Sequence, residues 1–104
     1  MSNFDKREKG FESKYAHDKE TEFKVQARRN KLLGLWAAEI LGLAGEAAET
    51  YAKQVVVADF DEPGDEDVFR KVFEDLKDKG QSEHQVRRQM ADLLETAREQ
   101  IASE

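Results

Sequence analysis

The acid-rich run ADFDEPGDEDVF is the first segment whose side chains could do chemistry, because carboxylates at such spacing can ligate calcium. Placing Asp59 at position 1 of an EF-hand loop puts Asp61 at position 3 and Gly64 at position 6, as that loop requires. Position 5 is then Pro63 and position 12 is Arg70, where the loop needs an oxygen ligand and a bidentate glutamate. The run therefore fails as a calcium site, and we interpret it as a solvated acidic turn before a helix.

Other catalytic and metal-binding patterns are also missing from the sequence. His17 and His84 lack the paired spacing of a zinc-binding helix, and no nucleophile is framed by a base and an orienting carboxylate. Gly34, Gly42 and Gly45 do not form a phosphate-binding loop and instead favour close helix packing or a bend. We therefore expect no enzymatic activity, no metal site and no cofactor.

A basic cluster on the first predicted helix could hold a nucleotide phosphate or an RNA backbone; it comprises Lys24, Arg28, Arg29 and Lys31. The competing interpretation is a solvated face that complements the acidic loop 59–67. With 17 Lys and Arg against 23 Asp and Glu, the chain has a net charge of −6, which opposes nucleic-acid binding. A nucleotide-binding site at Arg28, Arg29 and Lys31 remains an alternative.

The elements that must position these groups are all helices. Apolar residues recur at helical spacing in four segments, and one proline in 104 residues leaves long helices possible. We predict an all-α protein, a small four-helix bundle with a flexible N-terminal arm at residues 1–17. The bundle is expected over residues 18–104, with helices at about 18–43, 46–60, 66–79 and 83–102.

The predicted core follows from the apolar stripes. LLGLWAAEILGL is apolar nearly all round, so its helix should be central, with Trp36 in the core. The β-branched run Val55-Val56-Val57 would suit a strand, but the helical spacing around it favours a helix. Pro63-Gly64 and Gly80 predict turns, Ser82 with Gln85 predicts a capping box, and Met90 is expected to fill the core.

The first 17 residues have few large apolar side chains. Phe4, Phe11 and Tyr15 would align along one side of a helix, at i, i+7 and i+11. That stripe is too thin to anchor the segment firmly on its own bundle. From spacing alone, a loose tail or extra packing layer and a segment that folds in a partner's groove are equally compatible.

The chain as a whole resembles a known family. The run ARRNKLLGLWAAEILGL, residues 27–43, is similar to the signature segment of the zeta inhibitor subunits of alphaproteobacterial F-type ATP synthases. The resemblance extends to FDKREKGFESKYAHDKETEFK before this run and to YAKQVVVADFDEPGDEDVFRKVFEDL after it, and it weakens after Gly80.

The resemblance implies a protein inhibitor of ATP hydrolysis. The N-terminal arm would enter a catalytic α/β interface of the ATP synthase head and block rotation in the hydrolysis direction. Its partners would be the α, β and central-stalk subunits, and the free protein would be a monomer without nucleic-acid or membrane-inserting activity. We expect a cytoplasmic protein, peripheral on the membrane-bound enzyme, whose contacts come from Phe4, Asp5, Arg7, Glu8, Phe11, Glu12, Lys14 and Tyr15.

Overall fold

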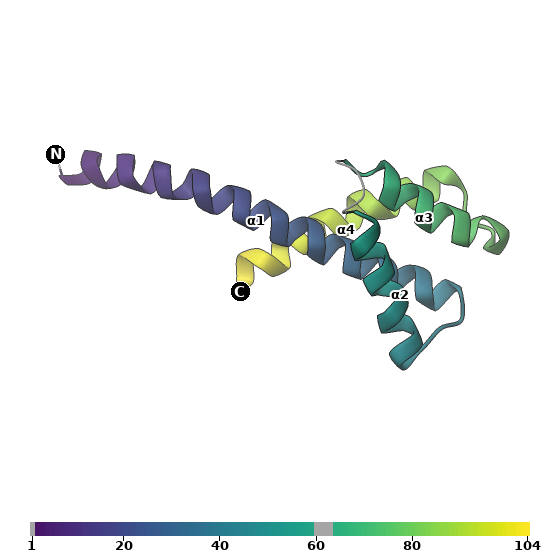
Figure 1. The fold of residues 1–104 in the computed structure, drawn as a ribbon. Coiled ribbons are helices and arrows are strands. Elements are labelled where there is room, and N and C mark those ends of the chain that lie inside the picture. The colour runs from purple at the N-terminus through teal and green to yellow at the C-terminus, as the bar shows by residue number, and fades with distance from the viewer. Residues whose placement is uncertain (1, 60–63) are drawn as a thin grey trace.

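The computed structural model describes the backbone of residues 2–59 and 64–104, and the side chains of residues 19–59 and 64–104. Four α-helices and one 3-10 turn follow one another in these ranges: α1 (Ser2–Ile40), α2 (Gly45–Ala58), α3 (Glu66–Leu76), η1 (Lys77–Lys79) and α4 (Glu83–Ser103). The C-terminal half of α1 packs against the other three helices (Figure 1). The predicted all-α four-helix architecture is confirmed.

Helix α1 is longer at one end and shorter at the other than the predicted segment 18–43. It begins at Ser2, because the arm has no proline and is rich in residues that tolerate helix. It ends at Ile40 because Gly42 adopts a φ of 80° and starts the turn earlier than expected. The amide of Leu43 donates to the carbonyl of Ala38 and that of Gly42 to Glu39, a Schellman motif that satisfies the last carbonyls.

Helices α1 and α2 approach each other closely at Gly34. A Cβ atom placed on Gly34 would lie 2.5 Å from the Cα atom of Ala52, a distance that real contacts do not reach. Only a residue without a side chain fits there, so the predicted role of this glycine in close helix packing is confirmed.

The hydrophobic core is formed by one face of each helix. Leu33, Ala37 and Ala38 of α1 meet buried residues of the other helices: Tyr51, Val55, Val68, Phe69, Val72, Leu76, Val86 and Met90. Met90 fills the core as predicted, and the three-valine run is helical as its spacing indicated. Trp36 is only partly buried and packs against the edge of the core rather than within it.

Helices α3 and α4 begin and end near the predicted positions. The expected helix 66–79 divides into α3 and η1, and Gly80 follows with a φ of 84°. At the start of α4, the Ser82 hydroxyl accepts from the Gln85 amide, while the Gln85 side chain accepts from the Ser82 amide. This reciprocal pair is the predicted capping box.

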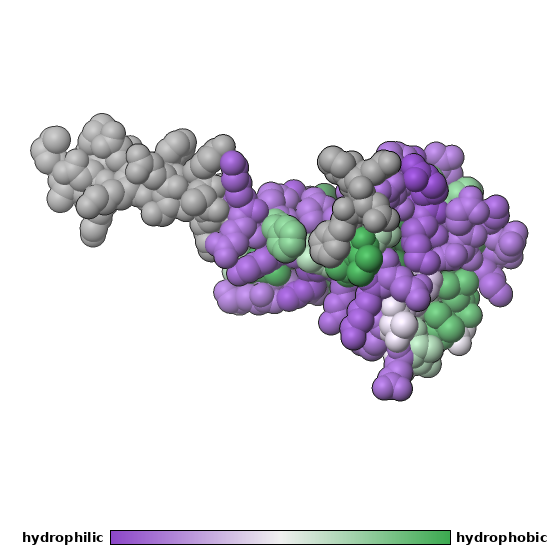
Figure 2. All heavy atoms as spheres, in the orientation of Figure 1, coloured by the Kyte–Doolittle hydropathy of each residue, from purple (hydrophilic) through white to green (hydrophobic). Residues whose placement is uncertain are grey.

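The molecule is elongated, with principal extents of 61 × 26 × 22 Å, because the N-terminal half of α1 projects from the bundle (Figure 1). On the face shown in Figure 2, the described surface is mostly hydrophilic, with hydrophobic side chains in separate patches, one of them near the turn between α1 and α2. Within the described part of the chain, every helix is too short or too polar to cross a membrane.

Candidate functional site

The predicted inhibitory residues lie on the projecting half of α1. The backbone there is helical and continuous with the bundle's first helix (Figure 1). The structure does not describe the side chains of residues 4–15. The mobility expected of residues 1–17 likewise falls outside what the structure describes. Their contacts therefore remain predictions.

Helix α1 joins the bundle where α4 ends beside it. Val25 is the first buried residue of the described part of α1, 2% exposed. Arg98 of α4 pairs with Glu22, and Arg28 donates to Gln100 at 2.7 Å and pairs with Glu104. Polar contacts on either side of Val25 thus hold α1 against α4 close to where the projecting half of α1 leaves the bundle.

Phe23 is exposed at this same point and is not among the site residues predicted from the sequence. Its side chain is 64% exposed. Among the large hydrophobic residues of the described part, Val57 is the only other one that is exposed. The available signal was an aromatic residue in a strongly charged stretch, between Glu22 and Lys24. Exposed aromatic residues of this kind are enriched at protein interfaces.

The basic cluster considered for nucleotide binding does not form one open face. Arg29 is 1% exposed: its Nε donates to the Asn30 side chain at 2.7 Å, and its Nη2 to Gln26 at 3.0 Å and Asp65 at 2.7 Å. Arg28 is engaged with α4, while Lys24 and Lys31 are exposed.

This arrangement corrects the solvated-face interpretation for Arg29, which is buried. The predicted charge complementarity between the basic cluster and the acidic loop is present at one point, where Arg29 pairs with Asp65, the residue before α3. A buried guanidinium destabilises the fold unless it has hydrogen-bonding partners, and the network around Arg29 supplies them. The same network links α1 to the N-terminus of α3. The side-chain amide nitrogen of Asn30 is buried and has no hydrogen-bond partner among the residues whose side chains the structure describes.

Two further electrostatic groups link neighbouring helices. Arg87 of α4 donates to both carboxylate oxygens of Glu66 at 3.1 and 3.2 Å and lies 3.8 Å over the Phe69 ring, and these hydrogen bonds lower the pKa of Glu66. Tyr51 of α2 donates to Asp75 of α3 at 2.7 Å, and burial, followed by this carboxylate, raises the pKa of Tyr51. Both groups hold neighbouring helices together: the first links α4 to α3, and the second links α2 to α3.

The chain is similar to known proteins over most of its length. The model of a family described as ATPase inhibitor subunit zeta matches residues 1–100. A solved structure titled "Solution NMR structure of the protein" is 50% identical, with a TM-score of 0.73, covering 79% of this chain and 95% of that one. No curated protein matches the sequence.

Proposed function

This chain belongs to the family of ATPase inhibitor zeta subunits, and on that basis we propose how it inhibits the ATP synthase. The projecting half of α1 enters a catalytic α/β interface of the enzyme head and blocks rotation in the hydrolysis direction. The observation that carries this proposal is the division of α1, whose second half is held inside the bundle while its first half stands clear (Figure 1).

The chemistry of the projecting segment fits an interface of this kind. Phe4, Phe11 and Tyr15 supply the apolar anchors, and Phe23 adds a fourth aromatic about two helical turns after Tyr15. Truncating a few buried aromatics usually costs most of the affinity of an interface. The charged residues between them make the polar contacts, namely Asp5, Arg7, Glu8, Glu12 and Lys14.

Inhibition also requires discrimination among the catalytic conformations. A ligand that binds all conformations equally shifts none of them, so the arm must bind one interface more tightly than the others. An enzyme trapped with one interface occupied cannot complete the rotary cycle. The bundle, by docking nearby, raises the local concentration of the arm.

The nucleotide-binding alternative gains no support from the geometry. Arg29 is 1% exposed and already donates three hydrogen bonds within the chain, and Arg28 is engaged by α4. A phosphate would have to displace these partners before binding.

Deletion of Ser2 to Tyr15 tests the proposal, with ATP hydrolysis by the cognate enzyme as the measurement. We expect the shortened chain to lose inhibition, because the anchors are gone. Its thermal unfolding should stay close to that of the full chain, because the first buried residue of the described part of α1 is Val25. Full inhibition by the shortened chain would assign the activity to the bundle instead.

A further inference from the structure

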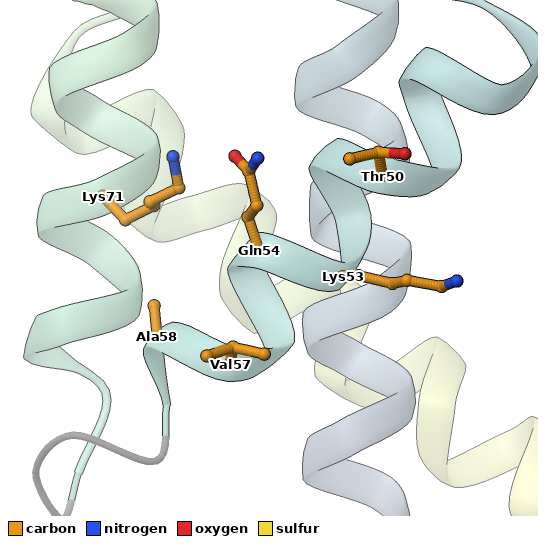
Figure 3. Close-up of a pocket in the computed structure, with 6 residues that line it drawn as sticks. All are labelled: Thr50, Lys53, Gln54, Val57, Ala58 and Lys71. Carbon is orange, nitrogen blue, oxygen red and sulfur yellow. The ribbon is translucent and has the colours of Figure 1, made fainter.

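A shallow groove lies between α2 and α3, away from the projecting half of α1. Its volume is about 540 Å³, and its lining comprises Thr50, Lys53, Gln54, Val57, Ala58 and Lys71. Five of these residues come from the solvent side of α2, and Lys71 extends toward Gln54 from α3 (Figure 3). Lys53 extends on the opposite side of α2, so the two lysines bracket a strip of neutral residues (Figure 3).

The groove differs chemically from the rest of this acidic chain. None of its six lining residues is acidic, although the sequence has 23 Asp and Glu. Val57 is 56% exposed and is one of two large hydrophobic residues that are exposed in the described part of the chain. The groove thus combines apolar surface with two cations.

The two cations are not equivalent. The Lys71 ammonium lies 3.0 Å from Asp75 and 4.9 Å from the centre of the Tyr51 ring, so its charge is largely engaged within the bundle. Lys53 is exposed and has no ion pair with any residue whose side chain the structure describes. Lys53 is therefore the side chain with charge available for a partner.

We propose that this groove docks the bundle onto an acidic segment of the ATP synthase, one that places a carboxylate next to an apolar side chain. This inference rests on the proposed function and names a second contact surface for it. The carboxylate pairs with Lys53, and the apolar side chain covers Val57 and Ala58. Charge complementarity of this kind accelerates association and fixes the docking register.

Two other occupants fit the groove less well. A small ligand usually occupies a concave pocket that buries most of its surface, whereas this groove lies open along α2. A second copy of the chain carries the same net charge of −6, which opposes self-association.

Charge reversal in the full-length chain tests the proposal. Lys53→Glu should raise the concentration needed for half-inhibition of the cognate ATPase about tenfold at low salt, equivalent to one buried charge contact. The difference from wild type should shrink at high salt, because screening weakens the wild-type contact. Arg88→Glu on α4 is the matched control, since it makes the same charge change at an exposed position outside the groove, and it should inhibit as wild type does.

Cross-linking identifies the occupant directly. The sequence has no cysteine, so Val57→Cys provides a single attachment point for a photo-activated cross-linker, with Arg88→Cys as control. We expect only Val57→Cys to cross-link strongly, to a peptide of the enzyme that contains Asp or Glu. Cross-linking between two copies of the chain, or to a segment without acids, would overturn the proposal.

The two proposals fail in different ways. If the wild-type chain does not inhibit hydrolysis, the proposed function is wrong, whatever Val57→Cys cross-links to. If the wild type inhibits while Lys53→Glu and Arg88→Glu both match it, the groove proposal is wrong and the arm proposal stands.

Discussion

Two described stretches of α1, residues 19–24 and the stretch from Val25 to Ala38, belong to one continuous helix but differ in how far their side chains are buried. From Val25 to Ala38 the helix buries Leu33, Ala37 and other residues against its neighbours, and Gly34 lets α2 approach closely. Residues 19–24 have no buried side chain. Helical backbone needs only tolerant residues, whereas a place in the core needs small or apolar ones. A single helix can therefore bury its side chains in one stretch and leave them accessible in the preceding one.

The largest effect on stability should come from the enclosed half. Leu33 is fully buried, so Leu33→Ala should lower the free energy of unfolding by about 2–5 kcal/mol through lost contacts and a residual cavity. Urea denaturation measures this change. Leu35→Ala is the matched control, because Leu35 is only partly buried on the same helix and should cost less. Equal losses of unfolding free energy for Leu33→Ala and Leu35→Ala would contradict the prediction that the fully buried position contributes more to stability.

A smaller loss is expected at the buried guanidinium. Arg29→Ala removes hydrogen bonds to Gln26, Asn30 and Asp65 and should lower the free energy of unfolding by about 2 kcal/mol. Arg28→Ala, which breaks a more exposed pair, should cost under about 1 kcal/mol. Urea denaturation compares the two variants. An unchanged stability for Arg29→Ala would mean that the network does not tie α1 to α3.

The smallest stability effect should occur at the exposed aromatic. Phe23→Ala should change the free energy of unfolding by no more than about 0.5 kcal/mol, because the side chain is 64% exposed. It should nevertheless weaken inhibition of the cognate ATPase about tenfold if the ring is buried in the complex. Glu20→Ala, one turn earlier and exposed, serves as the control. If Phe23→Ala inhibits as strongly as the wild type, Phe23 is not part of the surface that contacts the enzyme.

Much of the fold could be predicted from local patterns in the sequence. The helical spacing of the four segments and the Ser82–Gln85 capping box depend on residues close in sequence, and both the helices and the capping box are present. Long-range features were missed for physical reasons. The burial of Arg29 depends on Asp65, which lies 36 positions away. Val68 is fully buried because α3 packs against more than one neighbouring helix.

The candidate site was less predictable than the fold. The arm was predicted because its apolar residues are sparse in a charged background, and its contacts stay a prediction. The groove was not found, because Lys53 and Lys71 lie on different helices and their separation in space depends on how α2 packs against α3. Phe23 was missed because an isolated aromatic has no periodic partner, and only its exposed fraction marks it.

The contact between Gly34 and Ala52 has a mechanical consequence. With no side chain interposed, the two backbones meet almost directly, so there is no flexible layer through which one helix could slide on the other. Lys53 directly follows Ala52, and Val57 lies farther along the same helix. A displacement of the outer side of α2 is therefore expected to displace the middle of α1 as well, because the two helices move together at this contact.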